Sequence, residues 1–174
     1  MWSSPGTFEV RLTVRDAAGN LGEHTASIVV RDTTAPSAEA GPDLAVNEDT
    51  SVAFDAGLSV DNGPGFPAGA TFLWLFRDGN LNLRLSGATA SYTFETPGVF
   101  AVTLLVVDGD GNLAADELRV TVRDTTAPVL SVEGGLTQTF EEDRPVTLDA
   151  SRSVDNDPSF AATGAFRWSF EDAT

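Results

Sequence analysis

The chain of 174 residues has no cysteine, no lysine and a single histidine, His24. Without a thiol, and with only one imidazole, it cannot form a disulfide, a cysteine nucleophile or a zinc site built from nitrogen and sulfur ligands. A Ser-His-Asp triad would have to recruit His24, which stands between Glu23 and Thr25 and is expected to be exposed on a strand. The residue inventory therefore predicts a protein that is not an enzyme.

Long apolar runs are also missing from the chain. A membrane helix needs roughly 18–20 consecutive apolar residues, so we expect no membrane insertion in this segment. All ten basic residues are arginines, and 26 acidic residues outnumber them, which gives a formal net charge of −16. This charge argues against nucleic acid and anionic membranes as partners, because both attract basic surfaces. The absence of lysine has two interpretations, a GC-rich genome or an acidic surface adapted to salt or loaded with cations.

A six-residue motif, Arg-Asp-Thr-Thr-Ala-Pro, occupies residues 31–36 and recurs 92 positions later at residues 123–128. The recurrence indicates a tandem repeat, and a unit of 92 residues is large enough to have a core of its own. We therefore expect one complete domain, residues 32–123, between the last part of a repeat, residues 1–31, and the first part of another, residues 124–174. The motifs form the joints, whose inter-domain residues are Asp32, Pro36, Asp124 and Pro128.

Residues 7–15 alternate apolar and polar side chains, which predicts a half-buried strand with Phe8 on its apolar face. A turn containing Gly and Asn follows, and then a second strand, so these residues form a hairpin that leads into the first joint. The same hairpin returns at an offset of 92, where Phe100 takes the place of Phe8. Phe8 and Phe100 are thus predicted to be core residues of their repeats.

The pattern Phe-x-Trp-x-Phe occurs at residues 72–76 and again, at an offset of 94, at residues 166–170. A tryptophan on a middle strand is typical of the core of an immunoglobulin-like sandwich, and we expect Trp74 and Trp168 to occupy that place. Short apolar runs between turn residues and the lack of a helical period predict the same class. The predicted fold is all-β: a tandem repeat of immunoglobulin-like β-sandwiches, one complete and two partial.

Five segments of the complete repeat resemble a PKD domain: residues 40–43 (Ala-Gly-Pro-Asp), 54–56 (Phe-Asp-Ala), 59–61 (Ser-Val-Asp), 74–79 (Trp-Leu-Phe-Arg-Asp-Gly) and 97–104 (Pro-Gly-Val-Phe-Ala-Val-Thr-Leu). PKD domains are immunoglobulin-like modules of extracellular proteins, and archaeal surface-layer proteins and secreted bacterial enzymes carry many of them. The family's Trp-Asp-Phe-Gly-Asp-Gly has lost its first Asp in both copies here. The resemblance covers the complete repeat and both partial ones, and it implies a location outside the cell or at the cell surface.

Oxygen ligands for a hard cation occur in the turn formed by residues 108–112, Asp-Gly-Asp-Gly-Asn. Ca²⁺ prefers several carboxylate and amide oxygens, and it is the only cofactor that the sequence indicates. The equivalent turn of the first copy, which begins at Asp16, has one acid fewer, so ion binding is not a fixed property of the repeat. An ordinary hairpin turn is the alternative. The candidate ligands are Asp108, Asp110, Asn112 and Asp61, the last of which is also expected near an end of the domain.

Two phenylalanines, Phe66 and Phe160, lie at equivalent places in a long loop that precedes each tryptophan strand. In one interpretation the ring folds back and plugs one end of the sandwich. In the other it is an exposed aromatic that contacts a neighbouring module, a polysaccharide or a surface protein. The sequence leaves both open.

The positions of the joints place the last hairpin of a sandwich at the N-terminus and the front strands of one at the C-terminus. Together these fragments lack only the stretch equivalent to residues 81–93, and each alone would expose an apolar face. We expect a structural module of an extracellular or cell-surface array, whose partners are neighbouring repeats or copies of itself.

Two further hypotheses concern how the module works. In the first, the C-terminal half of one chain pairs with the N-terminal half of the next, by strand complementation, and forms a linear fibre. Its alternative is that the two halves are arbitrary cuts in a longer array. The second hypothesis, from a different class, is an adhesion or accessory module that binds protein or polysaccharide.

Overall fold

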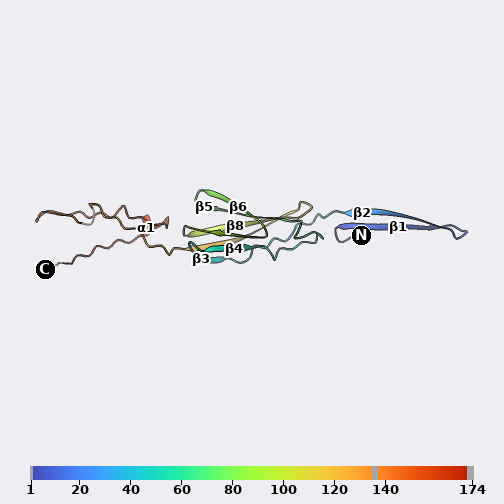
Figure 1. Ribbon diagram of the computed structural model, residues 1–174, viewed down its shortest axis with the longest axis horizontal. Coiled ribbons are helices and arrows are strands. Elements are labelled where there is room, and N and C mark those ends of the chain that lie inside the picture. Colours follow the sequence, from blue (N-terminus) through green and yellow to red (C-terminus); the bar gives the residue numbers. More distant parts are fainter. Residues whose placement is uncertain (1, 135–136, 172–174) are drawn as a thin grey trace.

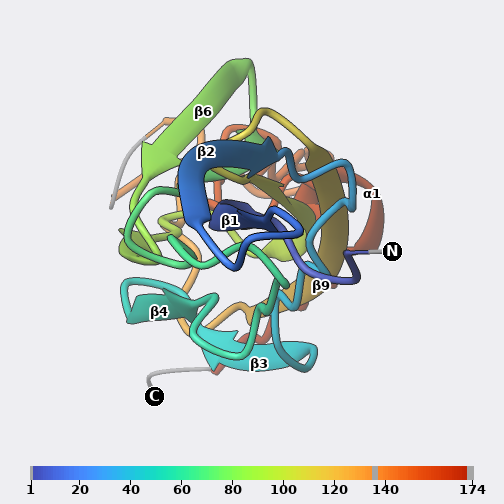
Figure 2. The ribbon, with the colours of Figure 1, turned by 90° about the vertical axis from the view of Figure 1, so that its right-hand side faces the viewer.

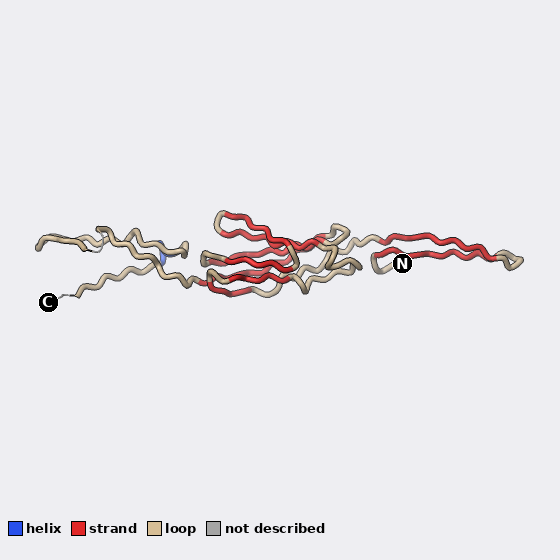
Figure 3. Tube along the Cα trace, viewed as in Figure 1, coloured by secondary structure: helices blue, strands red, loops and turns tan. Residues whose placement is uncertain are grey.

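The computed structural model describes residues 2–134 and 137–171, which form nine strands and one helix of four residues. Three parts follow one another along a line: a hairpin, a central sandwich and a C-terminal segment (Figure 1). Strands are confined to the first two parts, while the third is almost entirely loop (Figure 3). The hairpin and the C-terminal segment therefore lie at opposite ends of the sandwich.

The hairpin consists of β1 (Gly6–Arg15) and β2 (Leu21–Val30), which pair antiparallel with Phe8 opposite Ile28. Its turn is closed by Asp16, whose carboxylate accepts hydrogen bonds from the backbone N–H of Asn20 at 2.8 Å and from its side-chain amide at 2.7 Å. No second sheet covers the apolar face among the described residues, so Phe8 is only half-buried, against Trp2 at 5.7 Å between ring centroids. The predicted core position of Phe8 is thus not enclosed.

The central sandwich has a five-stranded sheet in the order β3-β9-β8-β5-β6 and a two-stranded sheet, β4-β7. Only β3 and β9 pair in parallel within these two sheets. Figure 2 looks along the molecule from the hairpin end, with β1 and β2 in front of the sandwich strands. The strands are β3 (Leu44–Asn47), β4 (Ser51–Asp55), β5 (Thr71–Asp78), β6 (Leu81–Ser86), β7 (Thr89–Thr93), β8 (Gly98–Val107) and β9 (Leu113–Arg123).

Trp74 lies at the centre of the core, with none of its side chain exposed. Its ring stacks on Phe54 at 5.2 Å between centroids, which brings the two sheets together, and its indole N–H donates to the carbonyl of Gly87 at 3.1 Å. The polar end of the ring is therefore satisfied inside the sandwich. Phe100, at the start of β8, is half-buried against Phe94 at 4.4 Å, so it closes one end of the same core.

The C-terminal segment repeats several local features of the sandwich. The isolated bridge between Val129 and Val154 matches the one between Ser37 and Val60, and Asp143 has a φ of 57° where the equivalent Asp49 has 59°. These features fall at the spacings of the sequence repeat.

The expected tryptophan strand at residues 166–170 does not form. Phe166 is 51% exposed, Trp168 is 41% exposed and Phe170 is 82% exposed. A strand needs a neighbour to pair its backbone groups, and none lies beside these residues in the described part of the chain. A short helix, α1 (Phe160–Thr163), occurs in the preceding loop, where no helix is predicted.

Candidate functional site

Three aspartates, Asp32, Asp61 and Asp108, meet at the end of the sandwich that faces the hairpin. Each provides one carboxylate oxygen, and these three oxygens all lie within 4.8 Å of one another. Asp32 follows β2 in the first joint, Asp61 lies in the long loop before β5, and Asp108 opens the turn between β8 and β9. Residues far apart in the sequence are thus brought together where the chain enters the sandwich.

Each carboxylate is held by its own turn. Asp32 Oδ1 accepts a hydrogen bond from the backbone N–H of Thr34 at 2.9 Å, and Asp61 Oδ2 accepts one from Gly63 at 2.8 Å. Asp32 Oδ2 and Asp61 Oδ1 are buried and have no hydrogen-bond partner. The turns therefore fix both side chains while each keeps one free oxygen.

Asp108 is the most heavily bonded of the three. Its Oδ1 accepts from the backbone N–H groups of Asp110 at 2.9 Å and Asn112 at 2.8 Å, and its Oδ2 accepts from the Asn112 amide at 2.7 Å. Burial of Asp108 raises its pKa, but these hydrogen bonds, with those from Asn112 foremost, outweigh burial and leave the pKa below the usual value. The carboxylate is accordingly ionised at neutral pH.

No positive side chain balances this cluster. Asp32 and Asp108 are only 6% and 7% exposed. Within residues 2–134 and 137–171 the single salt bridge is the one between Arg11 and Glu23, on the hairpin. The cluster is therefore a region of concentrated negative charge at the first joint.

The four candidate ligands from the sequence have different positions in this site. Asp61 and Asp108 are two of the three clustered acids, and Asp110 lines the same small cavity, with a volume of about 180 Å³. Asn112 directs its amide N–H groups at Asp108 and, at 3.4 Å, at the carbonyl of Asp32, so it acts as a donor. Asp32 is not among these four candidate ligands, because the sequence identifies it only as an acid at a joint, where an ion could stiffen the array. Its place at the start of the repeated motif is a signal, but its neighbours are visible only in the folded chain.

The second joint is secured by Glu48, a carboxylate that is 3% exposed. Its oxygens accept hydrogen bonds from the Thr126 hydroxyl at 2.6 Å, the Thr125 backbone N–H at 2.9 Å and the Asn156 amide. The bonds from Thr126 and Thr125 lower the pKa of Glu48 to about 2. Glu48 therefore ties the joint and the C-terminal segment to the sandwich as an anion.

Two acids of the second joint repeat the geometry of the first. Asp124 accepts from the Thr126 backbone N–H at 3.0 Å, as Asp32 does from Thr34, and Asp155 Oδ2 is buried without a partner. Asp124 is nevertheless exposed, because no turn like that of Asp108 covers it in the described chain. The second joint thus has two of the three acids.

The loop phenylalanines both fold back onto the chain. Phe66 packs against Phe72 at 6.0 Å between ring centroids, and Phe160 packs against Phe166 at 5.9 Å. Each is half-buried. Phe66 also packs against the buried core of the sandwich, whereas Phe160 lies in the C-terminal segment, where no sheet forms in the described residues.

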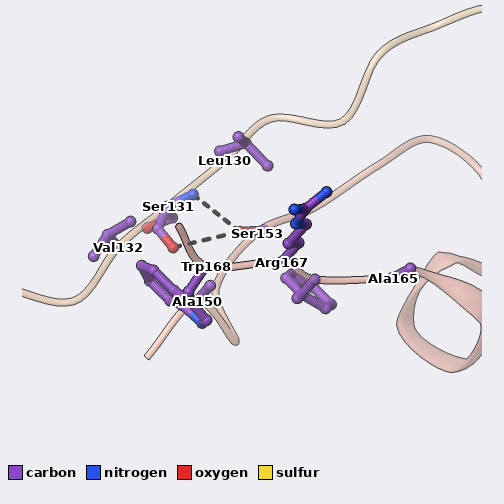
Figure 4. Close-up of a pocket in the computed structure, with 9 residues that line it drawn as sticks. Leu130, Ser131, Val132, Ala150, Ser153, Ala165, Arg167 and Trp168 are labelled. Carbon is purple, nitrogen blue, oxygen red and sulfur yellow. Dashed lines mark hydrogen bonds between the residues drawn. The ribbon is translucent and has the colours of Figure 1, made fainter. Parts of the chain in front are cut away.

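A groove of about 280 Å³ opens on the C-terminal segment (Figure 4). The side chains of Leu130, Val132 and Trp168 line it, and the Ser131 backbone N–H donates to the Ser153 hydroxyl at 3.0 Å beside it. In the sandwich, Ala40 and Trp74, which are equivalent to Val132 and Trp168, are buried in the core. Here Val132 and Trp168 face solvent.

Comparison with known proteins agrees with this architecture. The model of the PKD domain matches residues 33–122. Over 162 residues the chain is 28% identical to the dyslexia-associated protein KIAA0319 homolog of Mus musculus, a match that covers 87% of this chain and 14% of that relative. No helix in the described ranges is long and apolar enough to cross a bilayer. With the matched family model covering the whole sandwich, the chain belongs to the PKD domain family, whose members are non-catalytic immunoglobulin-like modules.

Proposed function

We propose that this chain is a structural module of an extracellular or cell-surface array, in which short joints hold successive sandwiches in line. The observation that carries the proposal is the attachment of both joints to the sandwich. Asn112 donates to the Asp32 carbonyl at the first joint, and Glu48 accepts from Thr125 and Thr126 at the second. A spacer that resists bending needs joints of this kind, because free linkers would let the modules rotate.

The flanking parts fit further partial repeats of the same domain. Asp143 and Asp49 share a left-handed backbone, and the bridge at Val129 matches that at Ser37. Asp124 also keeps the turn hydrogen bond of Asp32. These equivalences support an array in which one joint connects each domain to the next. Membership of the PKD family supports a location outside the cell.

The rigidity of the second joint can be measured with two spin labels. The chain has no cysteine, so Asn82→Cys on β6 and Ala161→Cys on α1 give one label in each part without background labelling. We expect double electron–electron resonance to give a narrow distribution of distances between the two labels. The distribution should become broad after Glu48→Ala.

Glu117→Ala, which removes an exposed acid from β9, is the matched control and should leave the distribution narrow. A distribution in the unmodified chain as broad as that of Glu48→Ala would contradict a spacer role.

A second candidate function, assembly of copies head to tail, is favoured by two exposed apolar faces at opposite ends of the molecule. Leu12 is 59% exposed and Val14 is 57% exposed on β1, while the groove around Trp168 opens at the other end. In the sandwich the residues equivalent to Leu12 and Val14 are Leu104 and Val106, which are fully buried on β8. There they lie opposite Trp74 and Phe72 of β5, respectively. The hairpin of one copy has the side chains to cover the groove of the next, and such a contact generates a linear fibre.

Assembly is tested by light scattering and negative-stain microscopy over a range of concentrations. Leu12→Asp should abolish concentration-dependent growth, because it places a charge on the covering face. Leu81→Asp, at a residue of β6 that is 62% exposed, is the control and should assemble normally. A chain that stays monomeric at every concentration would exclude assembly and leave the spacer role intact.

The alternative of a protein- or polysaccharide-binding module receives less support. Flat rows of exposed aromatic rings are the usual platform for sugars, whereas Phe66 and Phe160 are half-buried against Phe72 and Phe166. One ring in each loop, folded inward, offers little contact surface.

A further inference from the structure

We propose that Asp32, Asp61 and Asp108 bind one Ca²⁺ ion at the first joint. The ion would be held by the segment that enters the sandwich and by two of the sandwich loops. All three acids belong to the same chain, so the proposal does not depend on whether the chain assembles.

The first argument is the free oxygen of Asp32. This side chain is 6% exposed, its Oδ1 is used by Thr34, and its Oδ2 has no partner although it is buried. Asp61 Oδ1 is also buried and unpartnered. A buried charged oxygen is costly unless it is hydrogen-bonded, paired or bound to a metal. Both free oxygens belong to the same cluster, so a single cation would satisfy both.

The second argument is the close approach of the carboxylates around Gly63. A Cβ atom at this position would lie 2.8 Å from Asp61 Oδ2 and 2.9 Å from Asp32 Oδ2, so any other residue would push the acids away. The glycine thus leaves room for two carboxylates to converge. Like charges at this range repel strongly in a partly buried place, and no arginine pairs with them in the described chain.

The third argument is the chemistry of the ligands, which favours a hard cation such as Ca²⁺. The cluster offers only oxygen, which excludes the nitrogen and sulfur sites preferred by zinc. Two oxygens on opposite sides of a Ca²⁺ ion are about 4.6–5.2 Å apart, twice the usual bond length. The three oxygens of the cluster lie within 4.8 Å of one another, so one Ca²⁺ ion can contact all of them. Ca²⁺ takes about six to eight oxygen ligands, so water and the neighbouring Asp110 in the same cavity would complete the shell.

The consequence concerns the joint. Asp32 is joined to β2, while Asp61 and Asp108 belong to loops of the sandwich. An ion shared by all three fixes the exit of the hairpin against the sandwich, and its removal leaves three repelling charges there. At the second joint Glu48 supplies the attachment instead, through hydrogen bonds.

Calorimetric titration of the whole chain with Ca²⁺, after removal of metal with EDTA, tests the proposal. We expect one ion per chain. Asp32→Asn keeps an oxygen for the Thr34 N–H but loses the charge, and it should weaken binding by roughly tenfold or more, because affinity depends on the charge of the ligands. Asp61→Asn should do the same.

Asp124→Asn is the matched control, since Asp124 occupies the equivalent place in the second joint but is exposed. It should bind Ca²⁺ as the unmodified chain does. No binding of Ca²⁺ by the unmodified chain at millimolar concentration would overturn the proposal, and so would equal losses in Asp32→Asn and Asp124→Asn. Binding of Mg²⁺ as tight as that of Ca²⁺ would overturn the assignment to calcium.

Thermal unfolding separates a metal ligand from a residue that only supports the fold. Ca²⁺ should raise the melting temperature of the unmodified chain, because a ligand that binds only the folded state stabilises it. Asp32→Asn should be insensitive to Ca²⁺ and, in EDTA, should melt no lower than the unmodified chain, since one repelling charge is gone. A lower melting temperature in EDTA together with an intact response to Ca²⁺ would show a purely structural role for Asp32 and sink the proposal.

Discussion

Glu48 is a buried acid that stays charged because of what surrounds it. It receives hydrogen bonds from the Thr126 hydroxyl, the Thr125 backbone and the Asn156 amide, all of which lie beyond the end of β9. These donors stabilise the anion, which is why the pKa of Glu48 falls to about 2. The same bonds hold the joint, so the charge of Glu48 and the order of the joint are linked.

The linkage gives the second joint a defined pH dependence. The pKa of Glu48 is lowered from 4.5 to about 2 on folding, so its contribution to stability is complete above about pH 4.5 and is lost as the pH falls toward 2. We expect the backbone amide signals of Thr125 and Thr126 in nuclear magnetic resonance spectra to report an ordered joint until the pH approaches 2. Glu48→Gln should remove this transition.

Glu117→Gln, at an exposed site on β9, controls for the titration of other acids and should keep the transition. A joint that loses order near pH 4.5 in the unmodified chain would contradict the link between Glu48 and the joint.

Individual residues differ in how far the sequence predicts their role. Trp74 is predicted as a core residue because its neighbours alternate, and the structure places it fully inside the sandwich. Glu48 and Asp32 look like ordinary acids near a domain end, since the sequence does not show which loops converge on them. Glu48 and its partner Thr125 are 77 residues apart in the sequence. Asp32 and the two other aspartates of its cluster come from three separate segments. Alternation is visible among neighbouring residues of the sequence, whereas the convergence of several loops depends on the tertiary structure.

At the scale of elements, one hairpin occurs in two environments. β1 and β2 stand alone, while β8 and β9 have the same sequence pattern inside a five-stranded sheet. An isolated hairpin is marginally stable in water, because it gains backbone hydrogen bonds but little burial. The first hairpin therefore has the backbone hydrogen bonds of the second without its burial, so the contribution of burial can be measured within a single chain.

Hydrogen exchange should reveal this difference in a dilute sample. We expect the amides of β1 to exchange at least about a hundredfold faster than the position-matched amides of β8, because local opening of the exposed hairpin costs far less than opening of the sandwich. Val10 and Val102 occupy equivalent positions, since they pair with Ala26 and Leu118, respectively. The exchange rates of their amides can therefore be compared directly within one sample. Equal protection of both hairpins would contradict the isolation of β1 and β2.

The sequence predicts elements well where pairing is local and poorly where it is not. The strand at residues 7–15 and its partner are predicted from alternation and a turn, and the structure has them as β1 and β2. The strand at residues 166–170 has equally clear alternation, yet it lacks a neighbour and remains a loop. The helix α1, Phe-Ala-Ala-Thr, is too short for any helical period to be visible in the sequence.

At the scale of the whole molecule, the three parts are arranged so that the hairpin and the C-terminal segment do not meet (Figure 1). The repeated motif predicts that the chain contains one whole unit and two parts, and the matched PKD domain covers the central unit. The exposed apolar face of the C-terminal segment contains Trp168, whose equivalent in the complete domain, Trp74, is buried. Whether a second sandwich can form there depends on supplying the missing strands.

A chimera supplies them directly. Residue 174 is equivalent to residue 80, so a second copy of residues 81–123 placed after residue 174 continues the repeat in register. We expect the appended strands to pair with residues 166–170 and enclose Trp168, which is 41% exposed in the chain alone. The tryptophan fluorescence should shift to shorter wavelength, because an indole leaves water.

The same chimera tests the cation site in a second place. The appended copy of Asp108 would join Asp124 and Asp155 and cover Asp124, so the number of Ca²⁺ ions bound should rise from one to two. A chimera whose appended copy carries Asp108→Asn is the matched control and should bury Trp168 but bind one ion. Burial of Trp168 with no added ion would refute the three-aspartate rule, whereas an unchanged Trp168 environment would show that residues 124–174 are not the front half of a sandwich. The two readouts therefore judge the repeat and the ion site separately, since burial of the tryptophan depends on strand pairing and the second ion depends on the third carboxylate.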